Sequence, residues 1–272
     1  MTAIDTGTED LLAEVSDGVA VLTMNRPARR NALSTDMLRA MAEVLAEVEV
    51  DDRVGCVVLT GAGGAFCAGG DVKGMAGRAA SGEGTNFDAA VQRQRLSQRA
   101  TSYRLWQMPK PTIAAIPGPA AGAGLSLALA CDLRYAASNA VLLTAFANVA
   151  FAGDYGGTWF LTRLVGSARA KELYYFSDRI DASEAERLGM VNAVFPAGNL
   201  EAEVMARAHR LAGGPRLAFR YMKENLNRAV HGELGECLDL EVTHHLHTGL
   251  TRDHREAAQA FVDKREPRFE GR

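Results

Sequence analysis

Two runs of small residues are the first candidates for chemistry. In residues 61–71 (GAGGAFCAGGD) a β-branched apolar run opens into residues so small that the backbone itself can contact a ligand. Successive N–H groups in such a turn can converge on a developing negative charge, and one preorganised donor contributes roughly 3 kcal/mol. The alternative is a tight turn that needs glycine only for its backbone angles. A dinucleotide-binding motif is not favoured, because Phe66 occupies the position of its third glycine.

The second run, residues 117–126 (PGPAAGAGLS), leads from a predicted buried strand into an alanine-rich helix. The N-terminus of that helix supplies unpaired N–H groups and the positive end of its dipole. Gly124 and Ser126 are similar to part of a nucleophile elbow, which would indicate a serine hydrolase. An elbow needs its strand directly before the first glycine, however, and Pro117 and Pro119 intervene. We therefore interpret Ser126 as a helix residue or a supporting donor.

A third run, residues 152–159 (AGDYGGTW), places an acid among glycines and aromatics just before a predicted helix. Asp154 could be the N-cap of that helix. It could equally be a general base, because partial burial raises the pKa of a carboxylate toward the working range. From the residues alone the two interpretations stand side by side.

Histidines and cysteines indicate no metal site and no disulfide framework. All six histidines lie beyond residue 200, and the cluster of His244, His245 and His247 has no accompanying HExxH arrangement or cysteine pair. These side chains are interpreted as surface or interface residues. The four cysteines are widely spaced and mostly lie in apolar runs, which predicts reduced thiols in the core.

The elements that must position these runs follow from hydrophobic periodicity and turn residues. Ser34 is a good N-cap for an amphipathic helix that continues through Val50. A loop that flanks the site is expected from Lys73 to Asn86, and only helix is expected from Thr158 onward. The further predictions are strands at 18–24, 54–59, 112–116, 132–136 and 141–146 and helices at 88–106 and 122–130.

Strand and helix units come first and helices follow, which predicts an α/β protein. Residues 1–197 are expected to form the parallel-sheet core and residues 198–272 a helical C-terminal region. The 272 residues are 47% hydrophobic and 23% charged with a net charge of −3, which is typical of one globular protein and does not favour a nucleic-acid partner. The sequence shows neither a signal peptide nor an apolar run of membrane-spanning length, so we expect no membrane association and a cytoplasmic location.

Together these runs resemble the crotonase family, also called the enoyl-CoA hydratase/isomerase superfamily, over about residues 18–269. The resemblance rests on motifs in the family's order: NRPARRNAL at 25–33, FCAGGD at 66–71, AAGAG at 120–124 with Cys131 and Asp132, and REA at 255–257 followed by AFVDKR at 260–265. It implies a spiral of ββα units with a helical tail that forms homotrimers, often paired into homohexamers.

The resemblance also implies the parts of the site. The N–H groups of Gly70 and Ala123 would form an oxyanion hole for the thioester oxygen of an acyl-CoA substrate. Coenzyme A would enter as part of that substrate, with no tightly bound cofactor and no metal. The resemblance further implies that the coenzyme A channel is lined by Ala28, Ala68, Asp71 and Val72, with Phe261 and Lys264 closing over the nucleotide end, often from a neighbouring subunit.

The family's hydratases hold water between two glutamates, and the matching positions here are Ser126 and Phe146. Asp154 stands where the Δ3,Δ2-enoyl-CoA isomerases carry a single carboxylate, and residues 153–161 are especially similar to the ring-epoxide isomerase type of phenylacetate degradation. One carboxylate suffices for isomerisation, so an enoyl-CoA isomerase is favoured. The alternatives are a hydratase with an atypical water site and a non-catalytic scaffold that binds CoA esters.

Overall fold

The computed structural model describes residues 2–71 and 86–272. Val72 and the predicted loop from Lys73 onward lie outside the described residues, except for Asn86 at the end of that loop. The Asn86 side chain accepts a hydrogen bond from the Ala89 N–H and so caps the following helix.

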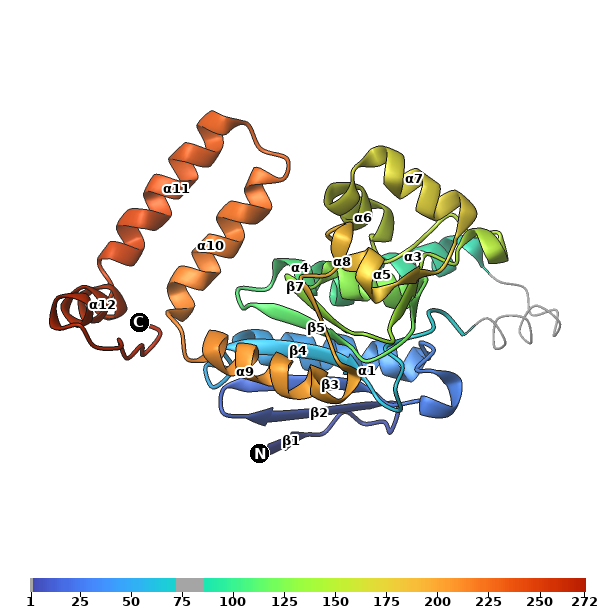
Figure 1. Ribbon diagram of the computed structural model, residues 1–272, viewed down its shortest axis with the longest axis horizontal. Coiled ribbons are helices and arrows are strands. Elements are labelled where there is room, and N and C mark those ends of the chain that lie inside the picture. The colour runs from blue at the N-terminus through green and yellow to red at the C-terminus, as the bar shows by residue number, and fades with distance from the viewer. Residues whose placement is uncertain (1, 72–85) are drawn as a thin grey trace.

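A sheet of seven strands forms the centre of the protein, in the order β1-β2-β3-β4-β5-β7-β10 (Figure 1). The strands from β3 to β10 run parallel, whereas β1, β2 and β3 pair antiparallel. The predicted parallel-sheet core is therefore confirmed. The strands are β1 Thr2–Ile4, β2 Leu11–Ser16, β3 Val19–Met24, β4 Cys56–Gly61, β5 Thr112–Ile116, β7 Leu133–Ala137 and β10 Ala193–Phe195.

A second, three-stranded sheet lies beside the main one. It joins β6 (Ala120–Ala121) to β8 (Val141–Leu143) in parallel and β8 to β9 (Ile180–Asp181) in antiparallel orientation. Because β6 belongs to the second glycine-rich run, this small sheet fixes that run between the main sheet and the helices that follow it.

Helices cover both faces of the main sheet, and the last three leave it (Figure 1). No helix in the described ranges has the length and apolar character that a membrane span requires. The α-helices are α1 Thr35–Val50, α3 Phe87–Gln98, α4 Arg104–Gln107, α5 Ala123–Ala130, α6 Gly157–Val165, α7 Ser167–Phe176, α8 Ala182–Arg187, α9 Leu200–Ala212, α10 Arg216–Ala229, α11 Leu234–Gly249 and α12 Arg252–Asp263. Between α3 and α4 lies a π-helical segment, Arg99–Tyr103.

The two faces of the sheet bury different residues because side chains alternate along each strand. In β4, Val57 and Leu59 point into the main core with α1 and α5, whereas Cys56 and Val58 point to the layer made by α9. Strands that are buried on both faces read as continuous apolar runs. That is why the 54–59 and 112–116 runs are recognisable as strands.

The sequence prediction is confirmed for the central elements and wrong for part of the second half. Ser34 accepts a hydrogen bond from the Met37 N–H and begins α1, which ends at Val50 as predicted. The expectation of helix alone beyond Thr158 is wrong, because β9 and β10 interrupt the helices. These strands have two and three residues, too few for a periodic pattern to emerge.

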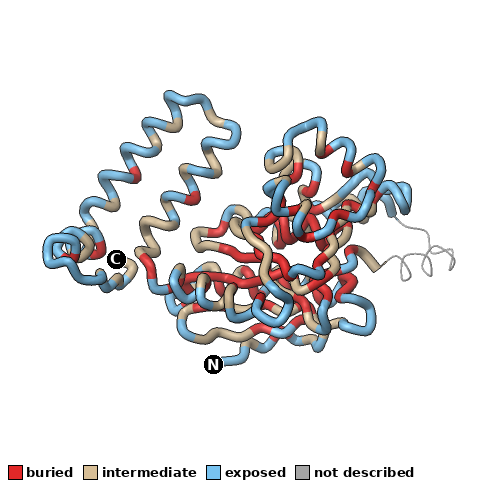
Figure 2. Tube along the Cα trace, in the orientation of Figure 1, coloured by how far each residue is buried: buried red, intermediate tan, exposed pale blue. Residues whose placement is uncertain are grey.

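The C-terminal helices α10, α11 and α12 extend away from the body and are largely exposed (Figure 2). Helix α9 instead buries Leu200, Val204, Ala208 and Ala212 against the sheet. Large apolar side chains remain exposed along the extended helices: Met222, Leu226, Val230, Leu234, Leu238, Val242, Leu246, Leu250, Phe261 and Val262.

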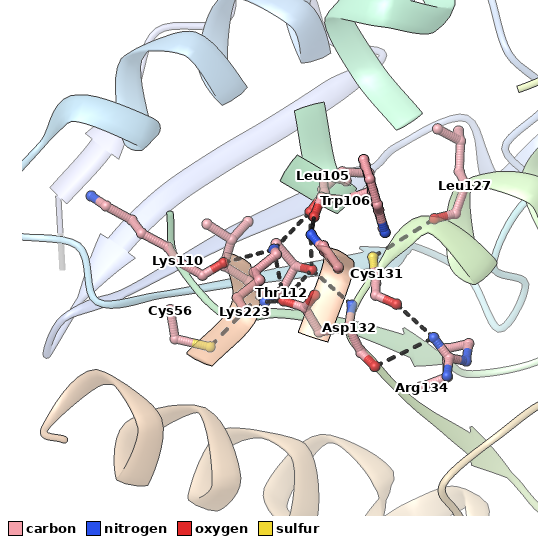
Figure 3. Close-up of polar contacts among 12 residues, drawn as sticks. Cys56, Leu105, Trp106, Lys110, Thr112, Leu127, Cys131, Asp132, Arg134 and Lys223 are labelled. Carbon is pink, nitrogen blue, oxygen red and sulfur yellow. Dashed lines mark hydrogen bonds and ion pairs between the residues drawn. The ribbon is translucent and has the colours of Figure 1, made fainter. Parts of the chain in front are cut away.

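A buried lysine fastens α10 to the body (Figure 3). The Lys223 ammonium is 2.8 Å from an Asp132 carboxylate oxygen and donates to the Leu105 and Lys110 carbonyls, each at 3.0 Å. Thr112 donates to the same Asp132 oxygen through its N–H at 2.8 Å and its hydroxyl at 3.0 Å. Lysine is almost never fully buried unless it is paired in this way. The network thus joins the extended helices to β5 and to the start of β7.

We expect Lys223→Met to lower the free energy of unfolding by about 3 kcal/mol, because it leaves Asp132 without its cation and two carbonyls without their donor. Chemical denaturation measures the loss. The matched control is Lys171→Met, an exposed lysine on α7, which should stay within about 0.5 kcal/mol of the wild type. Equal stability of the two variants would contradict this role of Lys223.

Candidate active site

The two glycine-rich runs are held side by side by a short parallel ladder between Cys67 and Ala120. The Phe66 and Cys67 N–H groups both donate to the Pro119 carbonyl, at 3.0 and 3.2 Å, and the Ala121 N–H donates back to the Cys67 carbonyl at 2.9 Å. Backbone hydrogen bonds thus fix the distance and register between the runs.

Glycine is required at two points where the runs touch. Gly69 has φ +90°, and a Cβ there would lie 2.8 Å from the Ala121 carbonyl oxygen and 3.4 Å from the Ala123 nitrogen. A Cβ at Gly124 would lie between 2.5 and 2.7 Å from atoms of Cys67. Such contacts are too short for any side chain. The spacing of the glycines therefore reflects the close approach of two backbones.

The two predicted oxyanion donors lie on these adjoining segments. Ala123 is the first residue of α5, and Gly70 directly follows the glycine that packs against it. Across the described part of the chain, neither the Gly70 N–H nor the Ala123 N–H donates a hydrogen bond to a protein group. Two unpaired backbone donors in neighbouring turns can both bind an oxygen that gains negative charge.

Asn31 holds the first run in place and was missed by the sequence analysis. This fully buried residue has φ +58°, which is uncommon for a residue with a side chain. Its amide nitrogen donates to the carbonyls of Ala62, Ala65 and Phe66 at 2.9, 2.8 and 3.3 Å, and its amide oxygen accepts from the Arg26 N–H at 2.8 Å. The sequence signal available for Asn31 was its place inside the 25–33 motif.

Asp154 lies in the third run, just before α6. Its Oδ1 atom is buried and has no hydrogen-bond partner in the described residues. Burial raises the pKa of Asp154 from 3.8 to about 6, because desolvation disfavours the charged form. The N-cap interpretation is wrong, since α6 begins after Gly156 and no side chain caps it. The carboxylate thus has the pKa of a general base that works near neutral pH.

Three described ionisable groups near Asp154, namely Cys67, Tyr155 and Tyr174, are neutral near pH 7. Burial raises the pKa of Cys67 to about 12, and burial likewise raises the pKa of Tyr155 and Tyr174. The negative charge of Asp154 raises the pKa of all three as a smaller contribution, which places the carboxylate close to the first run and to α7. Of these four described groups, only Asp154 therefore has a pKa near neutral.

Ser126 and Phe146 lie beside this carboxylate loop. Ser126 lies within α5, which confirms it as a helix residue, and its hydroxyl donates to the carbonyl of Gly122, the N-cap of that helix, at 3.2 Å. Gly157 packs on it so tightly that a Cβ there would lie 2.3 Å from the Ser126 oxygen. The Phe146 ring stacks on Tyr174, with centroids 5.7 Å apart and planes 10° apart. Neither of the two residues that the resemblance matches to the hydratase glutamates carries a carboxylate.

Tyr174 is a second residue that the sequence analysis missed. A Cβ at Gly157 would lie 2.6 Å from its hydroxyl oxygen, and one at Gly153 would lie 3.3 Å from its ring, so the ring covers the Asp154 loop. It comes from α7, the helix after α6, and no local pattern marks it.

Three of the predicted channel residues lie together at the edge of the first run. Ala28, in the 3-10 helix Pro27–Arg29, and Ala68 are both exposed, and the Ala68 N–H donates to the Arg30 carbonyl at 2.9 Å. Asp71 lies beside them, with its carboxylate 3.4 Å from the Arg26 guanidinium. The surface at the edge of the first run therefore carries two exposed alanines and one pair of oppositely charged side chains.

Phe261 and Lys264 do not join the other predicted residues. Both are exposed, on α12 and at its C-terminal end, and α12 lies at the opposite end of the molecule from α3 and α7 (Figure 1). Within one chain they cannot reach Gly70 or Asp154.

The histidine cluster lies outside the site. His245 and His247 are exposed, whereas His244 is buried between α10 and α11, where it stacks on Tyr221 at 4.2 Å. No group of three or more potential metal ligands occurs within residues 2–71 and 86–272. His244 therefore supports helix packing.

Comparison with known proteins gives one consistent family. The family model described as Enoyl-CoA hydratase/isomerase matches residues 14–272. The "Probable enoyl-CoA hydratase" of Rhodobacter capsulatus is 38% identical over 95% of this chain and 97% of that protein. The 1,2-epoxyphenylacetyl-CoA isomerase of Escherichia coli is 37% identical over 97% of this chain and 99% of that protein. A crystal structure of enoyl-CoA hydratase from Bacillus anthracis matches with a TM-score of 0.89 and 34% identity, covering 97% of this chain and 100% of that one.

The raised pKa of Asp154 predicts a pH-dependent stability. Because its folded pKa of about 6 exceeds its ordinary value of 3.8, ionisation costs the folded state stability as the pH rises from about 4 to above 6. Asp154→Asn carries no charge at either pH, so the variant should gain about 1–2 kcal/mol over the wild type between pH 4 and pH 7.5.

Urea denaturation at the two pH values measures this gain. The exposed Asp178→Asn provides the reference, because it removes a carboxylate of the same kind from the surface. A stability difference between Asp154→Asn and wild type that is independent of pH would contradict the burial of an ionised Asp154.

Proposed function

Because the chain belongs to the enoyl-CoA hydratase/isomerase family, we propose that it is an enoyl-CoA isomerase that moves a double bond along the acyl chain of a CoA thioester. The Gly70 and Ala123 N–H groups bind the thioester oxygen, and Asp154 carries the proton. The supporting observations are a partly buried carboxylate of raised pKa, Asp154, whose Oδ1 has no partner within the described residues, and two backbone donors, Gly70 and Ala123, that are unpaired there.

The reaction follows from these groups. The Asp154 carboxylate removes a proton from C2 of a 3-enoyl thioester. The electron pair of that C–H bond forms a double bond between C1 and C2, and the π pair of the carbonyl moves onto the thioester oxygen to give an enolate. The two N–H groups stabilise the enolate oxygen. The protonated Asp154 then returns the proton to C4, so the double bond lies between C2 and C3 and no atom is gained or lost. A pKa near 6 suits both steps, because the group is a base at neutral pH and its acid form still donates.

Residues at the hydratase positions support isomerisation over hydration. Adding water to a double bond needs one group that activates the water and another that protonates the α-carbon. Ser126 is engaged with the Gly122 carbonyl, and Phe146 is an apolar ring stacked on Tyr174. Relatives carry both hydratase and isomerase names, so hydration through a different water site is the second candidate.

The extended helices support a homotrimer, or a homohexamer built from two trimers, as the working form. Their exposed apolar side chains would be buried between subunits, and Phe261 and Lys264 would then close the coenzyme A channel of a neighbouring subunit beside Ala28, Ala68 and Asp71. We place the enzyme in the cytoplasm, with coenzyme A bound only as part of the substrate.

We expect Asp154→Asn to lower kcat for isomerisation by at least about 1,000-fold, because the amide cannot accept the proton. Binding of the CoA ester, measured by calorimetry, should change little, since the N–H donors remain. The assay uses a panel of straight-chain and ring-containing 3-enoyl-CoA esters. Unaltered turnover by the variant would contradict the role of Asp154.

Hydration is tested with crotonyl-CoA, whose enoyl absorbance disappears when water adds. The wild type should leave this absorbance nearly constant while it converts 3-enoyl esters. Rapid loss would favour the hydratase, and binding without any turnover on either panel would favour a CoA-ester scaffold.

A further inference from the structure

The helix that packs beside Asp154 is interrupted by a wider turn. Helix α3 continues into the π-helical segment Arg99–Tyr103 before α4 begins, and this segment packs against α1 and α5. The Thr101 hydroxyl donates to the Ser97 carbonyl at 2.7 Å, and the Ser102 hydroxyl donates to the Gln98 carbonyl at 3.1 Å. Both hydroxyl residues are buried. Short π-helical turns of this kind are frequent at functional sites.

Ser97 and Gln98 directly precede the π-helical segment, and both contact Tyr155, the residue after Asp154. The Gln98 side-chain oxygen accepts the Tyr155 N–H at 2.9 Å, and the Ser97 hydroxyl lies 3.2 Å from the Tyr155 hydroxyl. The amide orientation of Gln98 is not ambiguous here, because a backbone N–H requires an oxygen opposite it. Tyr155 is thus held at its backbone and at the end of its side chain.

Tyr155 needs such a restraint because its backbone is in an unfavourable conformation. Its φ is +49°, in the left-handed region that costs a residue with a side chain roughly 1–2 kcal/mol. Tyr155 is almost completely buried, and an unpaired buried N–H would cost about 1–3 kcal/mol more. Without the Gln98 oxygen, a rotation of the peptide between Asp154 and Tyr155 would relieve both of these energetic costs.

Rotation of that peptide would move the carboxylate. The buried Oδ1 of Asp154 makes no hydrogen bond within the described residues, so the direction of the side chain depends on the backbone that carries it. This peptide is held at both ends: its carbonyl, from Asp154, accepts the Gly157 N–H at 3.1 Å within the turn, and its N–H, from Tyr155, donates to Gln98 from outside the turn.

We propose that Gln98 is a positioning residue, which aims the Asp154 carboxylate at the substrate by holding the Tyr155 N–H. This role rests on the proposed function, in which Asp154 carries the proton. The π-helical segment begins directly after Gln98. It therefore determines how the end of α3, which carries Ser97 and Gln98, is oriented toward Tyr155.

Gln98→Met tests the proposal, because it keeps the length of the side chain and removes the acceptor. We expect kcat on the best ester of the panel to fall about 10- to 100-fold, the effect of misplacing a reacting group by around 1 Å. KM should change less than about threefold, since the oxyanion donors are untouched. Gln98→Glu restores an acceptor oxygen and should recover most of kcat, measured on the plateau of its own pH profile because the added carboxylate raises the pKa of Asp154. Gln92→Met is the matched control, an exposed glutamine on the same helix, and should behave as wild type.

The remaining outcomes distinguish a failure of the positioning role of Gln98 from a failure of the proposed function of Asp154. Wild-type kcat in Gln98→Met, together with an inactive Asp154→Asn, would reject the positioning role and leave the proposed function intact. A loss of kcat that Gln98→Glu does not recover, or that accompanies an equal rise in KM, would assign Gln98 a general structural role. Full activity of Asp154→Asn would reject both proposals.

Discussion

The site depends on one short backbone ladder, between Cys67 in the first glycine-rich run and Ala120 in the second. The first run leaves the carboxyl end of β4 and the second follows the carboxyl end of β5, and these strands are neighbours in the parallel sheet. Ligand sites in open α/β sheets form at such ends. The ladder brings the two runs within backbone contact, which small residues allow, and it leaves the Gly70 and Ala123 N–H groups free within the described residues.

A second constraint acts on the carboxylate. Asp154 is partly buried near Tyr174 and the first run and makes no salt bridge within the described residues, so burial raises its pKa. Burial of an ionisable group lowers the stability of the folded state, and groups with such perturbed pKa values cluster at functional sites. Its neighbours Ser126 and Phe146 are neutral and add no second titrating group. A single group of this pKa can give back the proton that it takes, and for this reason we propose isomerisation and not the two-group chemistry of hydration.

The sequence predicted the elements that carry strong local patterns. Ser34 and the apolar spacing after it marked α1, and the β-branched runs before residues 61 and 117 marked β4 and β5. Asn31, Gln98 and Tyr174 could not be found in this way, because each acts on a residue that is distant in sequence or through a backbone conformation that no periodicity encodes. β9 and β10 were missed because pairing with β8 and β7, rather than local propensity, makes them strands. The family resemblance supplied the roles of Gly70 and Ala123, which the geometry supports but the residues alone left open.

The pH dependence of kcat/KM for isomerisation of a 3-enoyl-CoA ester is the most direct test of the central claim, that one buried carboxylate of raised pKa carries the proton. The account predicts that log kcat/KM rises with pH, bends once near pH 6 and is then level through pH 8. A bend near pH 4, a second ionisation below pH 8, or a rate that rises as the pH falls would contradict it.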